Sequence, residues 1–178
     1  GKDLDAIPPE IRIGIKLHRL VDGYTDRHPI LQDLRPLFPS HLQRYRGICL
    51  DLFWDYCLSQ QWNALHSQPK ALWIRKNYTT LQTEMGRFET STPALPGMAQ
   101  AKFVLRRLIE YDWLSSYHGI DNIRIALERI GQRLKKSVPL EDSVDVLTTH
   151  EDHLQACFAE LFNDTLTFSK QSVADLTD

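Results

Sequence analysis

Apolar residues recur at intervals of three and four along most of the chain, and prolines separate the resulting runs. This spacing is typical of amphipathic helices, whereas no alternation of useful length predicts a strand. Proline also marks the places where helices begin or end. The sequence therefore predicts an all-α fold, a helical bundle. The expected helices span residues 10–25, 30–37, 40–62, 71–88, 98–111, 120–136 and 141–169.

Two segments depart from this pattern. Residues 77–80, Asn-Tyr-Thr-Thr, are weak helix formers, so a break inside the helix 71–88 stays open. Residues 89–97 contain two prolines, a glycine and small hydroxyl residues, which favour a loop. Each flank of this loop is too short to form a core of its own. We therefore expect residues 1–178 to form a single domain whose last few residues are frayed.

The composition narrows the class of protein. A chain of 178 residues and 20.7 kDa with 42% hydrophobic residues can bury a substantial core. Its formal charge of -2 and pI near 6.4 give no global sign of a nucleic-acid or membrane partner. The three cysteines lack metal-type spacing, and we expect reduced core residues. From the charge we expect no nucleic-acid partner. No apolar run approaches the length that spans a bilayer, so we expect no membrane partner and, with reduced cysteines, a cytoplasmic protein.

Residues 48–58, ICLDLFWDYCL, form an apolar helical run that Asp51 and Asp55 interrupt. Their spacing of four places both carboxylates on one side of the helix, about one turn apart. Two like charges among core side chains raise each other's pKa, and a shared proton, arginine partners or a bound cation relieves the conflict. For these two residues alone, a pair at the rim that is satisfied by arginines and solvent is an equally open interpretation.

A second acidic group lies upstream. His18, Asp22 and Asp26 recur at intervals of four and form one polar stripe if the helix continues through Asp26. Pro29 disfavours helical geometry at His28, which would leave Asp26 and His28 on a turn. Imidazole and carboxylate ligands together suit manganese, iron or zinc, so we expect a metal site built from both helices. The candidate metal ligands are His18, Asp22, Asp26, His28, Asp51 and Asp55.

Three arginines flank the two acidic segments. Arg19 follows His18, and Arg44 and Arg46 directly precede the apolar run. Arginine can grip a phosphate with two parallel hydrogen bonds, so we expect Arg19, Arg44 and Arg46 to bind substrate. Trp54 could border a substrate channel, although most aromatic residues are expected in the core.

Two segments resemble the paired motifs of the acyl carrier protein phosphodiesterases. Residues 14–29, GIKLHRLVDGYTDRHP, resemble the pattern G-I-x-x-H-R-x-I-D-x-x-T-D-x-H-P. Residues 46–62, RGICLDLFWDYCLSQQW, resemble the pattern L-D-x-x-x-D-H-x-L-x-x-x-W. Residues 113–134 are similar to a later family run of W-L-x-x-Y, D-x-I and R-L, which is much less specific.

The resemblance implies an all-helical, divergent relative of the HD-domain metal phosphohydrolases. It implies a divalent metal, usually Mn2+, and hydrolysis of the phosphodiester that joins 4'-phosphopantetheine to a serine of acyl carrier protein. The partner would be the holo form of this acidic helical carrier, which a basic patch would attract. The metal would activate water, and a carboxylate that binds no metal would orient the water or take its proton. The expected catalytic residues are Asp22, Asp51 and Asp55.

Two departures from the family pattern keep alternatives open. Tyr56 stands where the family has a histidine, which removes one candidate imidazole. Family members also begin with N-x-L-A-H and G-N-x-x-A-D motifs, and we expect this chain, which opens at Gly1, to lack that segment and its metal ligands. The alternatives are an HD-type phosphohydrolase for a nucleotide or another small phosphodiester, and a helical binding module without catalysis.

Overall fold

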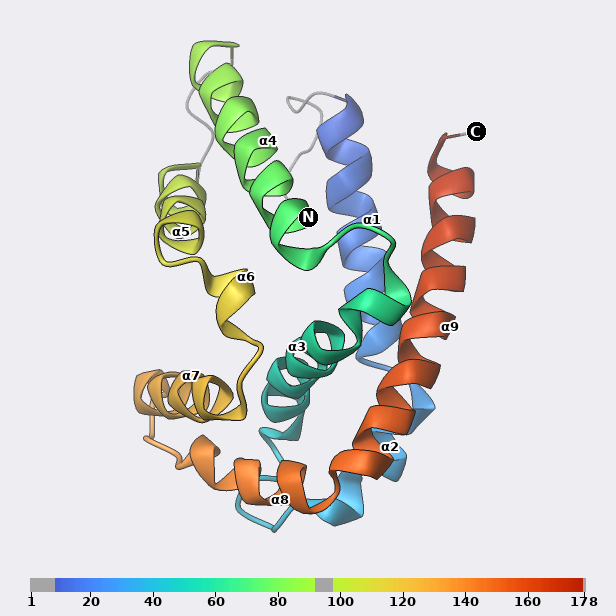
Figure 1. Cartoon of the computed structure of the whole chain (residues 1–178), viewed down its shortest axis with the longest axis vertical. Coiled ribbons are helices and arrows are strands. Elements are labelled where there is room, and N and C mark those ends of the chain that lie inside the picture. Colours follow the sequence, from blue (N-terminus) through green and yellow to red (C-terminus); the bar gives the residue numbers. More distant parts are fainter. Residues whose placement is uncertain (1–8, 92–97, 178) are drawn as a thin grey trace. The chain divides into compact units, whose positions relative to one another are not determined.

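The computed structural model describes residues 9–91 and 98–177, and every regular element within these ranges is a helix (Figure 1). The predicted all-α fold is confirmed for this part of the chain. None of its helices combines the length and apolar character that a membrane span requires. The elements are α1 Pro9–Thr25, α2 Pro29–Asp33, η1 Arg35–Leu37, α3 Arg46–Leu65, α4 Lys70–Ser91, α5 Met98–Glu110, α6 Trp113–Ser116, α7 Ile120–Arg133, η2 Leu140–Asp142, α8 Ser143–Thr149 and α9 Glu151–Thr177.

The described residues divide into two compact units. Unit 1 contains residues 9–50 and 142–177, and therefore α1, α2, η1, the first turn of α3, α8 and α9. Unit 2 contains residues 51–141, and therefore the remainder of α3 together with α4 to α7. The chain passes from unit 1 to unit 2 within α3. The single domain expected for residues 1–178 stays a prediction.

In unit 1, α1 and α9 lie side by side although they are far apart in the sequence (Figure 1). The Tyr24 ring stacks on Phe168 with centroids 4.3 Å apart, and it meets the edge of the His28 ring at 5.6 Å. Such aromatic pairs add attraction beyond the apolar area they bury. These contacts fix the end of α1, where several predicted site residues lie.

Prolines shape the segment after α1. The helix ends at Thr25, as predicted, and Pro29 occupies the start of α2. Proline suits this position because the N–H that it lacks would have no partner inside the helix. His28 is extended with a ψ of 135°, as expected before a proline. The expected helix 30–37 is divided into α2 and η1 because Pro36 cannot donate a backbone hydrogen bond.

The start of α3 was predicted too early. We expected Ser40 to cap this helix, but residues 40–45 form turns and α3 begins at Arg46. The Gln43 side chain donates hydrogen bonds to the carbonyl oxygens of Arg35 at 2.9 Å and Phe38 at 2.6 Å. Leu42, in the same turn, is fully buried. These contacts with the preceding segment stabilise the turn over a helical alternative.

α4 crosses residues 77–80 without the break that the sequence left open. The Asn77 side chain donates to the Trp73 carbonyl at 2.8 Å, and the hydroxyl of Thr79 donates to the carbonyl oxygen four residues before it at 3.0 Å. Polar side chains of this kind donate their hydrogen bonds to carbonyl oxygens of the preceding turn, and so they remain compatible with a helix. α4 also continues to Ser91, so residues 89–91 are helical; the rest of the predicted loop, 92–97, lies outside the described residues.

The last predicted helix is divided at His150. This residue closes α8, and α9 begins at Glu151 and continues to Thr177, so the fraying expected for the last few residues does not occur up to that point. The Thr149 hydroxyl donates to the Asp145 carbonyl at 2.6 Å, which helps to end α8. Glu151 and Asp152 then place negative charge in the first turn of α9, where the helix dipole favours it.

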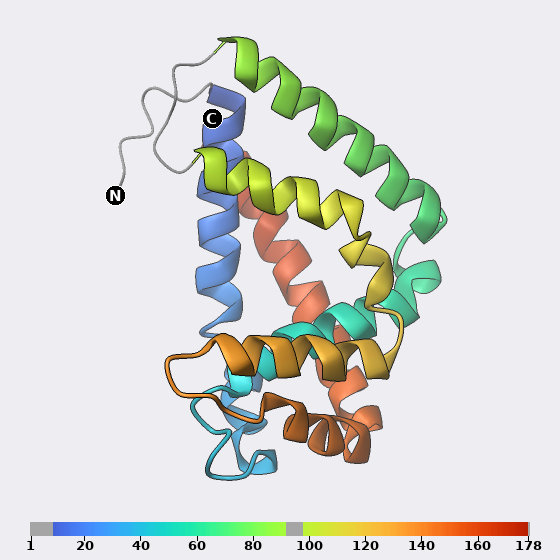
Figure 2. The ribbon, with the colours of Figure 1, turned by 90° about the vertical axis from the view of Figure 1, so that its left-hand side faces the viewer.

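Unit 2 is held together by hydrogen bonds at its corners. Trp62 Nε1 donates to the Gln68 carbonyl at 2.8 Å, and its ring centroid lies 5.1 Å from that of Trp73. Gln60 donates to the His118 carbonyl at 2.9 Å, which connects α3 to the segment before α7. Figure 2 shows α5, the short α6 and α7 following one another; α6 was not predicted. These contacts position α3 beside the segments that complete the site.

The cysteine prediction is confirmed for two of the three residues. Cys49 and Cys57 are buried in α3 and form no disulfide, as expected of reduced core residues. Cys157 is only partly buried.

Candidate active site

Asp51 and Asp55 stand one turn apart on the part of α3 that belongs to unit 2. Both residues keep solvent-exposed surface. Even so, the protein atoms around Asp55 displace water, and this burial raises the pKa of Asp55 from its ordinary 3.8 to about 6. Repulsion by Asp51 adds to the rise, while the charge of Lys70 lowers it. The pair therefore carries a charge conflict that a bound cation would relieve.

Lys70, the first residue of α4, brings a positive charge toward this pair. Its Nζ donates a hydrogen bond to Oγ of Ser59, which follows Asp55 by one helical turn. Burial lowers the pKa of Lys70, while the charges of Asp112 and Asp55 oppose that shift. A helix N-terminus carries partial positive charge and disfavours a cation. Attraction to its acidic neighbours therefore offsets the unfavourable position of Lys70.

Asp112 connects α5 to α6 in a backbone conformation that few residues adopt. Its φ of 45° and ψ of 51° lie in the left-handed region, which aspartate tolerates better than most side chains but at a cost in free energy. Tyr78 Oη donates to Asp112 Oδ1 at 3.1 Å and accepts a hydrogen bond from the Leu114 N–H at 3.3 Å. The left-handed turn thus directs a carboxylate toward Tyr78.

Tyr117 is half-buried and lies within electrostatic reach of Asp55. Burial raises the pKa of Tyr117, and the negative charge of Asp55 raises it further. Its hydroxyl therefore keeps its proton at neutral pH and can donate a hydrogen bond. Together these residues form what we call the Asp55 cluster. Its members are Asp51, Asp55, Ser59, Lys70, Tyr78, Asp112 and Tyr117.

Sequence reasoning found the two aspartates of this cluster but missed Lys70 and Asp112. Both carry a recognisable signal. A lysine in the first turn of a helix opposes the helix dipole, which indicates a specific acidic partner. Aspartate is one of the residues preferred at the position directly before a helix, and it tolerates a left-handed backbone better than most residues do. Neither signal identifies the partner, because that partner comes from another helix.

In unit 1, His18 and Asp22 form the pair that the sequence predicts. His18 Nδ1 lies 3.0 Å from Asp22 Oδ1 on α1, and both side chains are exposed, at 74% and 58%. Asp26 is also exposed, one residue beyond the helix end, and its backbone N–H donates to the Asp22 carbonyl at 2.9 Å. The structure therefore keeps these three side chains on successive turns, as the spacing of four implies.

His28 has different surroundings. Its ring is buried, and Nε2 lies 3.3 Å from Oδ2 of Asp164 on α9. Within the described residues, its buried Nδ1 has no hydrogen-bond partner. A histidine whose one nitrogen is held by a carboxylate presents the other nitrogen as a lone-pair donor, which is how many metal-ligating histidines are oriented. Asp164 is thus a positioning residue that the sequence did not reveal.

The three arginines predicted to bind substrate differ in exposure and in whether the guanidinium group already forms hydrogen bonds within the protein. Arg19 and Arg44 are exposed. The Arg46 guanidinium donates to the carbonyl oxygens of Gln43 at 3.0 Å and Leu31 at 3.4 Å, so it holds the start of α3. A role for Arg46 in substrate binding would require these bonds to open.

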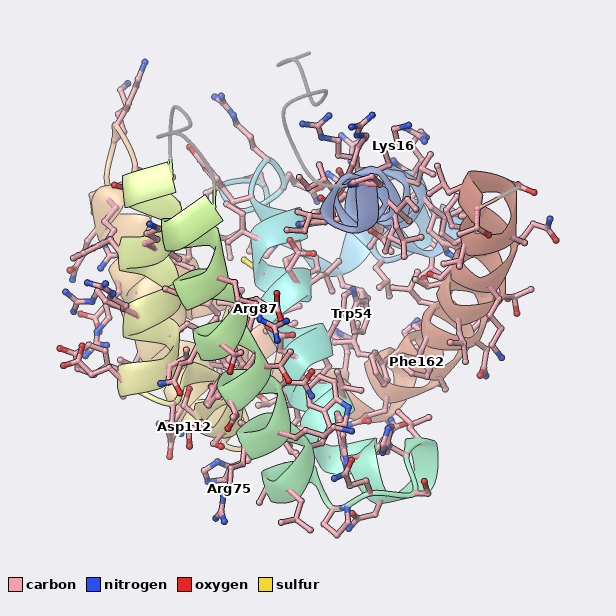
Figure 3. All side chains as sticks on the ribbon, turned by 90° about the horizontal axis from the view of Figure 1, so that it is seen from above. Lys16, Trp54, Arg75, Arg87, Asp112 and Phe162 are labelled. Carbon is pink, nitrogen blue, oxygen red and sulfur yellow. The ribbon has the colours of Figure 1, made fainter. Side chains whose placement is uncertain are left out.

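Trp54, the fourth predicted substrate-binding residue, is half-buried and is labelled in Figure 3. Its ring centroid lies 6.1 Å from that of Phe53. It lies on α3 between the two aspartates of the pair. An aromatic side chain that keeps part of its surface exposed can pack against an apolar ligand.

The six predicted ligands are divided between the units. Unit 1 holds the histidines and the two upstream aspartates, and unit 2 holds Asp51 and Asp55. Neither unit, within the residues that the structure describes, gathers three or more His, Cys, Asp or Glu side chains in a metal-binding group. The common metal site expected from the sequence therefore stays a prediction.

Comparison with known proteins adds an independent finding. The family model for acyl carrier protein phosphodiesterase matches residues 1–165. The acyl carrier protein phosphodiesterase of Escherichia coli O6:H1 strain CFT073 is 27% identical over 167 residues, which cover 91% of this chain and 80% of that protein. The protein of the same name from Escherichia coli strain K12 / DH10B is 27% identical over 166 residues, with the same coverage. No solved structure matches the chain.

The family match includes both acidic segments, α1 with His18 and Asp22 and α3 with Asp51 and Asp55. It also extends into α9 as far as residue 165, and so includes Asp164. A match of this extent does not depend on one short motif. The chain therefore belongs to the acyl carrier protein phosphodiesterase family, a family of hydrolases.

Proposed function

We propose that this protein is a metal-dependent phosphodiesterase that removes the 4'-phosphopantetheine arm from holo-acyl carrier protein and releases the apo-carrier. The family match over residues 1–165 is the observation that carries the proposal. The Escherichia coli relatives bear the name of this activity. The Asp55 cluster supports it, because a carboxylate whose pKa is raised beside a second carboxylate is frequent at functional sites.

The donor set fits a divalent cation. Carboxylate oxygens and imidazole nitrogens suit manganese, iron and zinc, and we propose Mn2+. Asp51 and Asp55 supply two carboxylates whose mutual repulsion a cation would relieve. In unit 1, the His18–Asp22 pair and the buried Nδ1 of His28 offer the same chemistry. We keep Asp26 among the proposed ligands because it follows Asp22 by one turn.

The metal ion and the carboxylates have separate roles in the proposed reaction. When bound, a divalent ion supplies Lewis-acid chemistry that activates water and neutralises charge on the phosphodiester. Asp55 must lose its proton to bind a cation, so its raised pKa sets the pH at which it becomes a ligand. A carboxylate that binds no metal, in either unit, would orient the attacking water or take its proton. The candidates for this role are Asp22, Asp51 and Asp55, and we propose that one of them does not bind the metal.

Substrate binding needs cations and an apolar surface. Arg19 and Arg44 are exposed and can grip a phosphate with two hydrogen bonds, whereas Arg46 is engaged at the start of α3. Lys70 adds an ammonium group within the Asp55 cluster. Trp54 would flank the prosthetic arm.

We further propose a divergent HD-domain-like arrangement and a cytoplasmic location. The resemblance of residues 14–29 and 46–62 to the family motifs supports the former. Three cysteines that form no disulfide suit a reducing compartment and support the latter.

The direct test measures arm release from holo-carrier by mass spectrometry, with Mn2+ and with a chelator. We expect release only with metal, and a fall of at least about 100-fold in Asp51→Ala and Asp55→Ala, since metal catalysis is worth several kcal/mol. Asp121→Ala, which removes an exposed carboxylate from α7 in the same unit, is the matched control. Full activity in both site variants would refute the site, and no release by the metal-loaded wild type would refute the function.

Tyr56 favours a second candidate, a helical binding module that holds the carrier without cleaving it. It stands where the family motif has a histidine, and its ring lies against Phe53 with centroids 5.4 Å apart. Calorimetric titration with holo-carrier separates the two proposals. Binding without release would support the module, and it would do so more strongly if Tyr56→His gained release. Competition by free nucleotides but not by carrier would instead indicate a small phosphodiester as substrate.

A further inference from the structure

We propose that one exposed side of α5 is the docking surface for an acidic helix of the carrier protein; this inference rests on the proposed function. We call this surface the α5 face and define it by Phe103, Arg106, Arg107 and Tyr111. It belongs to unit 2, on a different helix from the candidate catalytic residues.

Large apolar side chains are exposed on the α5 face. Phe103 and Tyr111 each keep 54% of their surface in solvent, and the neighbouring Val104 keeps 41%. Phe103, Arg107 and Tyr111 follow one another at intervals of four. Tyr111 comes directly after α5, and its backbone N–H still donates to the Arg107 carbonyl at 3.0 Å, so the three residues form one stripe. Clustered exposed apolar residues mark interaction sites more often than single ones do. Tyrosine, phenylalanine and arginine are also the residue types that protein interfaces favour.

Arg107 is held between the two rings of this stripe. Its guanidinium carbon lies 5.6 Å from the centroid of Phe103 and 4.8 Å from that of Tyr111. Cation–π attraction to both rings restricts the side chain before any partner arrives, so less conformational entropy is lost on binding. A stacked guanidinium can still donate hydrogen bonds to carboxylates. The stripe therefore combines an apolar surface with a prepared anion-binding group.

The charge of α5 selects the partner. The helix carries three basic residues, Lys102, Arg106 and Arg107, against one acid, Glu110. On α4, Arg87 is paired with Glu84 at 2.8 Å, so that pair adds no net charge. An α5 face placed against the α5 face of a second copy would bring like charges together. An acidic helix is electrostatically complementary, which raises both association rate and specificity.

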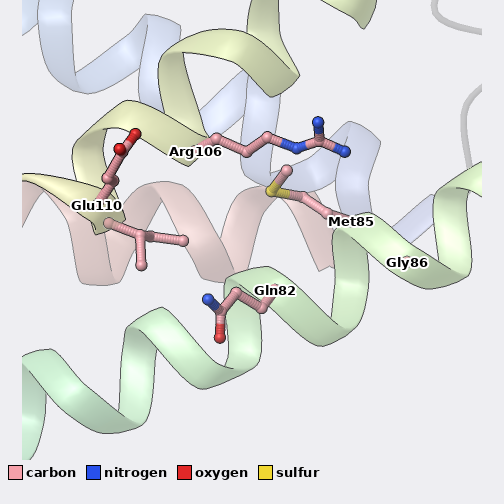
Figure 4. A pocket seen from close by; sticks show the side chains of 6 residues that line it. Gln82, Met85, Gly86, Arg106 and Glu110 are labelled. Atoms are coloured by element: carbon pink, nitrogen blue, oxygen red, sulfur yellow. The ribbon is translucent and has the colours of Figure 1, made fainter.

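A cleft beside the stripe gives the docked helix a place for a side chain. It lies between α4 and α5, has a volume of about 370 Å³, and is shown in Figure 4. Met85 and Ile109 supply apolar lining, while Arg106 and Glu110 project from α5. Helices commonly dock by laying an apolar face into such a groove. The lining residues are Gln82, Met85, Gly86, Arg106, Ile109 and Glu110.

The test separates docking from chemistry. Affinity for apo-carrier, which has no arm to cleave, is measured by NMR titration for the wild type, Arg107→Glu and Phe103→Ala. Kinetics are measured with holo-carrier and with bis(4-nitrophenyl) phosphate, a small diester that does not need the docking surface. Arg75→Glu is the control, because it makes the same charge change at an exposed residue of α4 in the same unit (Figure 3).

We expect Arg107→Glu to weaken apo-carrier binding and raise KM for holo-carrier by about tenfold or more. Its kcat and its activity on the small diester should stay at the wild-type level, and Arg75→Glu should change affinity less than about twofold. Equal effects of the two charge reversals, or loss of small-diester activity in Arg107→Glu, would overturn the docking proposal. So would a wild-type dimer that Arg107→Glu dissociates. A wild type that binds apo-carrier through Arg107 but releases no arm would defeat only the proposed function.

Discussion

Opposing electrostatic influences act on the Asp55 carboxylate. Burial and the like charge of Asp51 favour its protonated form, whereas Lys70 favours the ionised form. The resulting pKa of about 6 leaves Asp55 mostly ionised at neutral pH, but in an environment that disfavours the charge. The same imbalance that makes this residue unfavourable for stability makes it receptive to a cation.

Asp55→Asn should stabilise the metal-free protein at neutral pH. Because the pKa of Asp55 is raised from 3.8 to about 6 in the fold, the native state binds more protons than the unfolded state between these values. The free energy of unfolding of the wild type therefore falls as pH rises through this window. The variant lacks this loss, so its free energy of unfolding should exceed that of the wild type only slightly near pH 4 and by the full difference above about pH 6. Urea denaturation in the presence of a chelator measures this difference.

Glu128→Gln is the matched control for the change in net charge. Glu128 is exposed on α7 in the same unit, and glutamine keeps the oxygen that accepts a hydrogen bond from Gln132. The prediction is wrong if Asp55→Asn raises the free energy of unfolding by the same amount near pH 4 and near pH 7.5, or if Glu128→Gln raises it equally. Either result would show that the fold does not disfavour the negative charge of Asp55.

Asp164→Ala should destabilise the fold through His28. The substitution removes the carboxylate 3.3 Å from Nε2 and leaves the buried imidazole without a protein partner on either nitrogen among the described residues. A buried polar group that loses its hydrogen bond costs roughly 1–3 kcal/mol. Asp175→Ala, also on α9 but bonded only to the exposed side chain of Gln171 among the contacts described, should cost less than about 0.5 kcal/mol. Equal denaturation midpoints for the two variants would show that the contact contributes nothing.

At the level of the helices, hydrophobic spacing predicted which segments are helical better than it predicted where they end. α1 and α5 begin and end within one residue of the expected positions. The start of α3 and the division at His150 depend on side-chain hydrogen bonds to backbone carbonyls of neighbouring segments, and the spacing of apolar residues carries no information about these bonds.

In the candidate site too, contacts within one helix could be predicted and contacts between helices could not. The pairing of Asp51 with Asp55, and of His18 with Asp22, is local on one helix and could be predicted from a spacing of four. The approach of Lys70 to Asp55 depends on the corner between two helices, and no local pattern encodes it.

Gly131→Ala should disturb the end of α7. A Cβ at this position would overlap the carbonyl oxygen of Val138, because the chain folds back on the helix there. The backbone must shift to make room, and overpacking of this kind costs typically about 1–3 kcal/mol. Gly86→Ala, in α4 of the same unit, has nothing within 4 Å of the new Cβ and should instead stabilise by roughly 0.5–1 kcal/mol. Thermal unfolding of both variants measures the contrast, and equal shifts would contradict the close approach.

At the scale of the whole molecule, the family match relates the chain to known enzymes, whereas the division into two units separates the candidate metal ligands into two groups. The match covers residues 1–165 and therefore takes in parts of both units. Each unit contributes its own pair of candidate ligands, on α1 and on α3. A ligand that binds the native state stabilises whatever must be folded to bind it. Metal-dependent stability thus shows which pair the ion requires without any measurement of catalysis.

Mn2+ should raise the unfolding temperature of the wild type in a concentration-dependent manner. At about 100 times the dissociation constant, binding to the native state alone adds roughly 2.7 kcal/mol to the free energy of unfolding. Asp55→Asn should lose most of this gain, and His18→Ala should lose it too if the ion requires both pairs. The gain should also weaken as pH falls below about 6, because Asp55 takes up a proton and ceases to be a ligand. Calorimetry at several Mn2+ concentrations measures these shifts, with Asp121→Asn as the control. An undiminished gain in Asp55→Asn would place the ion elsewhere, and a full gain in His18→Ala alone would assign it to the α3 pair.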